Sequence, residues 1–231
     1  MRKGLAVTAA IFSLTSAGHA LAAPPSLGRC PQLAPREAME DDRKVPLTIP
    51  RQFAQLVRAT RDRIAVSTLT GAVHCIDTRD FTVARDYALS SDGRFFSFSW
   101  GGYEAGGYIL VDRTGRGQTV DTGDRPMFSP SRRKFAAIEI SESGFGSLNG
   151  FAVWQVDPVG IRRLTFLENL PQMQDWRLDG WSGEACIDIS AIAFGQYPDN
   201  EASLRKVPRV RYVARPATRG WSVVRGRCPR A

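Results

Sequence analysis

Four acidic residues and two tryptophans lie close together in the C-terminal third of the chain. They are Asp175, Trp176, Asp179, Trp181, Glu184 and Asp188. A sugar-cleaving site needs aromatic rings to stack the sugar, one acid to protonate the leaving group and a second to attack or to activate water. One hypothesis is therefore a small periplasmic hydrolase of polysaccharide or peptide that uses Asp175, Asp179 or Glu184. The competing interpretation is turn aspartates beside packed aromatic rings, because Asp179 precedes a glycine.

Motifs for other chemistries are missing from the sequence. His19 lies in the expected leader, so His74 is the single histidine left for a Ser-His-Asp site, and no G-x-S-x-G elbow accompanies it. The four cysteines form no C-x-x-C pair, which argues against zinc, and there is no D-x-D-x-D-G calcium loop. We therefore expect no metal and no cofactor, assign no catalytic residue, and favour a protein that is not an enzyme.

Aromatic residues in expected loops are the best candidates for binding. Tyr103 lies between two Gly-Gly pairs, and Phe145 lies at the centre of a Ser-Gly-Phe-Gly-Ser segment. Trp176 and Trp181 are further candidates. Loops on a rigid scaffold are where binding residues collect, although each of these rings could instead anchor its own loop.

A repeated turn and strand supply the scaffold. Residues 90–100 and 128–138 each combine a tight turn with a following strand, and a degenerate third copy starts at Trp176. In the first copy Phe96, Phe98 and Trp100 share one face by the period-two rule. A recurring unit of this size is typical of stacked blades. We predict an all-β, propeller-like repeat of antiparallel blades, three or four in number, arranged in a closed ring or an open array.

The turns carry a family resemblance. Ser91-Asp92-Gly93-Arg94 and Ser129-Pro130-Ser131-Arg132 resemble the S-P-D-G-R motif of bacterial propellers of the TolB and WD-repeat type. The following Tyr108–Gly115 segment is similar to the strand, Asp and Gly-turn element of such blades, and residues 103–156 resemble small exported bacterial proteins. The resemblance implies a repeat fold used as a binding platform, and it transfers no catalytic residue.

The first residues have the organisation of an export signal. Arg2 and Lys3 precede an apolar run over residues 5–15, and Ala20-Leu21-Ala22 provides a small-x-small cleavage pattern. We predict a signal peptide over residues 1–22 with cleavage after Ala22 or Ala23, an irregular lead-in over 23–60 and the repeat domain over 61–228. The expected location is periplasmic or secreted, with no transmembrane helix after cleavage.

Cysteine usage agrees with export. Cys30, Cys75, Cys186 and Cys228 all follow the expected leader, and an even number in an oxidising compartment suggests two disulfides. Three pairings exist. We favour Cys30–Cys228 with Cys75–Cys186, because a bridge between the two ends would close a ring; bridges between sequence neighbours are the main alternative.

Composition limits the partners. The formal net charge is +8, but the arginines are scattered without a run of five, so we predict no nucleic-acid binding. The favoured function is an exported binding module for an unknown envelope protein or polymer. The alternative is the periplasmic hydrolase described above.

Overall fold

The computed structural model describes residues 24–35, 45–141, 144, 146–198 and 200–229, and the regular secondary structure in this part of the chain is almost entirely β-strand. Three helical turns accompany the strands: η1 (Leu27–Arg29), η2 (Arg51–Phe53) and α1 (Glu201–Leu204). The expected leader and Phe145 lie outside the described residues. No helix in the described ranges is both long and apolar enough to cross a membrane.

The strands form four antiparallel sheets in chain order, which we name A to D. Sheet A contains β1 (Val57–Ala59), β2 (Arg63–Ser67) and β3 (Val73–Asp77). Sheet B contains β4 (Val83–Leu89), β5 (Phe95–Gly101), β6 (Gly106–Asp112) and β7 (Gln118–Asp121). Sheet C contains β8 (Met127–Phe128), β9 (Lys134–Glu139), β10 (Gly150–Asp157) and β11 (Gly160–Leu167). Sheet D contains β12 (Met173–Ser182), β13 (Cys186–Ala193), β14 (Arg209–Pro216) and β15 (Trp221–Arg225).

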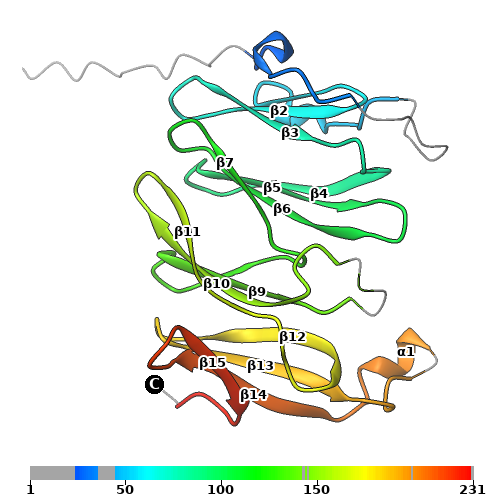
Figure 1. Cartoon of the computed structure of the whole chain (residues 1–231), viewed down its shortest axis with the longest axis vertical. Helices are drawn as coiled ribbons and strands as arrows, with labels where there is room; N and C mark the ends of the chain where they lie inside the picture. Colours follow the sequence, from blue (N-terminus) through cyan, green and yellow to red (C-terminus); the bar gives the residue numbers. More distant parts are fainter. Residues whose placement is uncertain (1–23, 36–44, 142–143, 145, 199, 230–231) are drawn as a thin grey trace, which may run out of the picture.

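The four sheets lie one upon another in the order A, B, C, D (Figure 1). Sheets A and D are at opposite ends of the long axis, so the blades form an open array and not a ring. This confirms the predicted all-β fold of stacked antiparallel units. The first strand, β1, lies inside the 23–60 segment that we expected to be irregular, and η2 lies just before it.

Period-two alternation explains why the sheets stack. In β5, Phe96 and Phe98 belong to the core between sheets A and B, whereas Phe95 belongs to the core between B and C. In β10, Trp154 faces sheet B and Val153 faces sheet D. Both faces of each inner sheet are therefore apolar. Burying such faces is worth roughly 25 cal/mol per Å² of apolar surface, so neighbouring sheets are required on both sides.

The turn-and-strand repeat is visible in the hydrogen bonds. Ser90 Oγ accepts the N–H of Phe95, and 39 residues later Ser129 Oγ accepts the N–H of Lys134. Gly93 has a φ of 69° and its counterpart Arg132 a φ of 58°, so both turns need a left-handed residue. The serine therefore closes the turn in both copies.

The third copy differs from the prediction. Residues 176–181 do not begin with a turn; they lie inside β12, a ten-residue strand. Its pairing with β13 shifts register between Gln174 and Arg177 and again between Leu178 and Gly180. Asp179-Gly180 is thus part of a bulged strand, and the turn of sheet D follows at Gly183, where φ is 60°.

Polar side chains at these turns fasten each sheet to the next. Arg94 forms a two-pronged ion pair with Asp112 in its own sheet, with N–O distances of 3.0 and 2.7 Å. The same guanidinium donates to the carbonyls of Asp157 (2.5 Å) and Gly160 (3.3 Å) in sheet C. Lys134 of sheet C donates to the carbonyl of Glu184 in sheet D at 2.9 Å. We call this side of the stack the turn edge.

The disulfides join sequence neighbours, which corrects the favoured pairing. Cys30 bonds to Cys75 and Cys186 bonds to Cys228, with Cα–Cα distances of 5.7 and 5.8 Å. A Cys30–Cys228 bridge is ruled out because those residues belong to opposite ends of the stack. Cys186 alternates with the core residue Ile187, so its bridge lies on the outer face of sheet D. Each disulfide therefore ties a terminal segment to an end sheet.

The first prediction concerns the Arg94 clamp. Asp112 is fully buried, and removing one partner of a buried ion pair leaves the other uncompensated. Arg94→Ala should lower the free energy of unfolding by about 3 kcal/mol, measured by urea denaturation. The control is Arg133→Ala, because Arg133 is the repeat-equivalent residue and its side chain donates a hydrogen bond to exposed Ser131 of the same turn. Equal effects of the two substitutions would contradict the clamp.

The second prediction concerns the end disulfides. The Cys186–Cys228 bridge spans 42 residues, so its removal by the double substitution to Ala should cost about 4 kcal/mol in the chain-entropy account. Non-reducing peptide mapping should recover a Cys30–Cys75 peptide and a Cys186–Cys228 peptide. Any peptide joining Cys30 to Cys228 would contradict the open stack.

Candidate functional site

The edge opposite the turns is formed by loops. In sheets B, C and D the second and third strands are joined by residues 102–105, 140–149 and 194–208, and the described parts of these connections lie along one side of the stack (Figure 1). We call this side the loop edge. Gly106, the first residue of β6, forms a β-bridge with Gly146, so the loop of sheet C contacts the end of sheet B on this side.

Exposed aromatic side chains gather on the loop edge. Tyr103 is 69% exposed in the sheet B loop, and Phe194 and Tyr197 are 64% and 48% exposed in the sheet D loop. Large exposed rings are the usual anchors of protein interfaces. Tyr103 was predicted as a binding-loop residue, and the structure places it on the surface.

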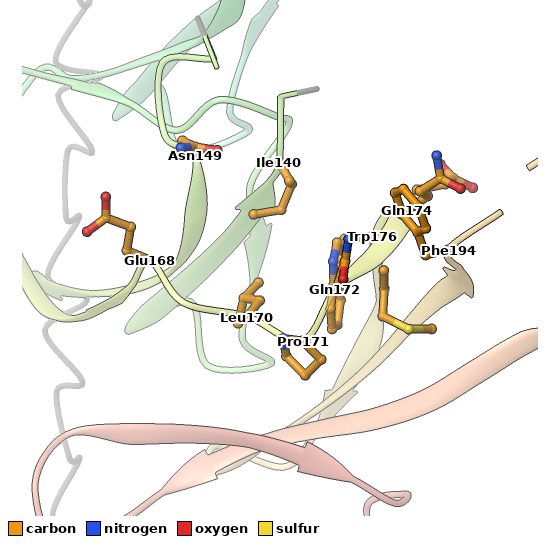
Figure 2. A pocket seen from close by; sticks show the side chains of 11 residues that line it. Ile140, Asn149, Glu168, Leu170, Pro171, Gln172, Gln174, Trp176 and Phe194 are labelled. Carbon is orange, nitrogen blue, oxygen red and sulfur yellow. The ribbon is translucent and has the colours of Figure 1, made fainter. Parts of the chain in front are cut away.

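A pocket of about 580 Å³ opens on the loop edge between sheets C and D. Ile140 follows β9, Asn149 precedes β10, and Phe194 follows β13. The connection from β11 to β12, residues 168–172, forms a further wall (Figure 2). This volume lies in the range of natural ligand sites.

The pocket lining is about equally polar and apolar, with uncharged amides, the exposed carboxylate of Glu168 and the carboxylate of Asp175, which is paired with Arg209 and Arg177. Leu170 and Pro171 lie between Glu168 and Asn149 on one side and Gln174 and Phe194 on the other (Figure 2). Gln174 accepts the N–H of Gly195 at 3.2 Å, which holds the sheet D loop against β12. Glu168 is exposed and forms no ion pair with any described residue. Such a lining suits an extended chain with an apolar side chain and a neighbouring cationic group.

The two tryptophan candidates lie on strand β12 and not in a loop. Trp176 is buried, packs on Tyr212 and reaches the pocket with part of its surface. Trp181 is half-buried, contacts Trp221 edge-on and donates its indole N–H to the carbonyl of Met127 at 3.0 Å. Both rings mainly join sheet D to its neighbour.

The candidate catalytic carboxylates are held by cations and backbone groups. Asp175 pairs with Arg209 at 2.5 Å and with Arg177 at 2.8 Å. Asp179 pairs with Arg211 at 2.6 Å. Both carboxylates are therefore engaged in ion pairs within sheet D.

The remaining two acids of the group have structural contacts as well. Glu184 accepts the backbone N–H of Ser131 at 2.8 Å, and this hydrogen bond lowers the pKa of Glu184. Asp188 accepts the N–H of Cys228 at 2.9 Å. Of these four acids Asp175 lines the pocket, where its carboxylate is paired with Arg209 and Arg177, and the described contacts of the other three are structural.

His74 belongs to the interface between sheets A and B. Its Nε2 shares a 2.7 Å hydrogen bond with Thr119 Oγ1 on β7. Burial disfavours the imidazolium and lowers the pKa of His74. A Cβ at Gly117 would lie 2.5 Å from the His74 Cβ, so the close approach of the two sheets also depends on that glycine.

Sequence reasoning missed Phe194, Tyr197 and the 168–172 wall. Phe194 follows an apolar run and was assigned to the strand itself. The sequence feature that indicates the end of the strand at this point is Gly195, because glycine commonly marks a turn. No group of three or more possible metal ligands occurs among the residues that the structure describes.

Comparison with known proteins adds no assignment, because no protein-family model and no curated protein matches the chain.

The third prediction uses the pKa of His74. Because folding lowers this pKa, below the ordinary value of 6.5 the unfolded chain binds a proton that the folded chain does not. The free energy of unfolding should therefore have no penalty from His74 above pH 6.5, and it should decrease as the pH drops below this value. His74→Gln should abolish this fall between about pH 6.5 and 5, where carboxylates contribute little. A pH profile unchanged by the substitution would contradict the assignment.

Proposed function

We propose that the chain is an exported, non-enzymatic binding module that holds a protein or envelope component at its loop edge. The single observation that carries the proposal is the 580 Å³ pocket on that edge, flanked by the exposed ring of Phe194. Export is supported by the leader-like first residues and by two disulfides, which persist in oxidising compartments. The similarity to TolB-type and WD-repeat blades is part of the same proposal.

The difference between the two edges supports binding at the loops. On the turn edge, Arg94, Lys134 and Arg113 are engaged in hydrogen bonds between sheets. On the loop edge, sheets C and D separate and leave a pocket. A rigid scaffold that presents exposed loops is the usual basis of a binding platform.

The favoured ligand is an extended peptide segment of a partner protein. Leu170, Met173 and Phe194 provide apolar surface for one side chain. The amides of Asn149 and Gln172 can pair with peptide groups. Glu168, exposed and without an ion pair among the described residues, suits a lysine or arginine beside the apolar anchor.

The fourth prediction tests the loop edge by photo-crosslinking in the periplasm. A benzoylphenylalanine in place of Phe194 or Tyr103 should give one discrete adduct with a partner. The matched control is the same group at Val159, which is 85% exposed in the β10–β11 turn on the opposite edge. Phe194→Ser should weaken retention of the captured partner at least tenfold, as expected for an aromatic anchor. No adduct at either loop position, or the same adduct from Val159, would overturn the proposal.

A further inference from the structure

A segment with an excess of basic residues lies at one end of the stack. Residues 201–229 contain eight Lys or Arg and one Glu, a formal excess of seven positive charges. The preceding strands of sheet D and their turn add the acids Asp175, Asp179, Glu184 and Asp188. In the sequence these arginines are scattered without a run of five. The segment nevertheless folds into sheet D and its flanking connections, at the far end of the long axis (Figure 1).

The alternation of β14 puts three arginines on the outer face of sheet D. Tyr212 and Ala214 of β14 lie in the core between sheets C and D. Arg209, Arg211 and Arg215 occupy the alternate positions and therefore face away from sheet C. Positions two residues apart on a strand are separated by about 7 Å, so Arg209 and Arg211 are neighbours on this face and Arg215 lies two such steps from Arg211.

Further basic residues border this face. Arg205 and Lys206 connect α1 to β14, and Arg227 precedes the cysteine that is bonded to Cys186 on the same face. All three are exposed. We call the outer arginines of β14 together with Arg205, Lys206 and Arg227 the basic end face.

Internal ion pairs neutralise only part of the basic end face. Arg209 pairs with Asp175 and Arg211 with Asp179. No ion pair joins Arg205, Lys206, Arg215 or Arg227 to any other residue in the described ranges. Structural pairing thus leaves an excess of exposed cationic side chains that are available to an external anion.

A second hollow gives the face a place for a single anionic group. It encloses about 620 Å³ and is lined by Arg177, Ala202, Leu204 and Arg205. Arg177 shares Asp175 with Arg209, whereas Arg205 has no described anionic partner. Two guanidinium groups beside apolar side chains match a phosphate that is attached to a hydrocarbon chain.

We propose that the basic end face docks on an anionic phospholipid surface. The face belongs to a sheet at the tip of an elongated stack, so it can approach a flat membrane without obstruction by sheets A to C. The outward positions of β13 and β14 carry no aromatic ring, and recognition of single-stranded nucleic acid depends on such rings. The loop edge would then project sideways from the membrane. This inference concerns a different surface from the proposed function and stands or falls separately.

The fifth prediction is tested by vesicle flotation of the purified protein. It should float with vesicles of phosphatidylglycerol and phosphatidylcholine, and remain behind with phosphatidylcholine alone. The triple variant Arg205→Gln, Arg215→Gln, Arg227→Gln should bind the anionic vesicles about 100-fold more weakly, since each basic residue near such a surface contributes about fivefold. High salt should weaken binding of the parent protein.

The matched control is Arg51→Gln, Arg58→Gln, Arg116→Gln, which removes three exposed arginines from sheets A and B and their connections. It should bind like the parent, and both variants should melt at the parent temperature. Equal loss in the two variants, or equal binding to neutral vesicles, would overturn the proposal. Binding to duplex DNA without binding to anionic vesicles would overturn it too, and would make this a nucleic-acid surface.

Discussion

Both faces of each inner sheet must be buried, and the rest of the structure depends on this constraint. Apolar residues alternate to the two sides of β5 and β10, so sheets B and C each need two neighbours. An open array leaves one face of sheet A and one face of sheet D without a neighbouring sheet. Terminal segments tied by Cys30–Cys75 and Cys186–Cys228 cover part of those faces. The disulfides thus act as caps of a repeat array, whose terminal units generally need protection.

The sheets stack with their turns on the same side, and the protein therefore has two different edges, the turn edge and the loop edge. The turns meet on one edge, where Arg94 and Lys134 reach the carbonyls of the next sheet. The loops meet on the other edge, where Tyr103 and Phe194 are exposed and a pocket opens between sheets C and D. Polar groups that fasten the stack are separated from the aromatic groups that are available to a ligand. The fold can therefore keep its sheets in register while its loops contact a partner.

Local pattern was enough to predict the blades but not their closure. The alternation of Phe96, Phe98 and Trp100 and the serine-closed turns gave the strands and the 39-residue repeat. The third unit was misplaced because a bulge in β12 imitates an Asp-Gly turn, and a bulge is defined by its partner strand. Disulfide pairing and the Phe194 pocket depend on which sheets are neighbours. The alternation of apolar residues within a strand does not predict that sheets A and D are far apart. It also does not predict that arginines spaced along the sequence lie together on the outer face of sheet D.

The measurement that tests the open stack most directly is a pair of distances by pulsed electron spin resonance. Nitroxide labels on introduced ketone-bearing residues at Arg58 in sheet A and Val224 in sheet D would report the distance between the two ends. Labels at Arg58 and Arg85 would report the distance between neighbouring sheets. Sheets pack about 10 Å apart, so three steps separate A from D by about 30 Å and one step separates A from B. The predicted result is that the distance between sheets A and D is clearly longer than the distance between sheets A and B. Similar A–D and A–B distances would mean a closed ring and would contradict the account.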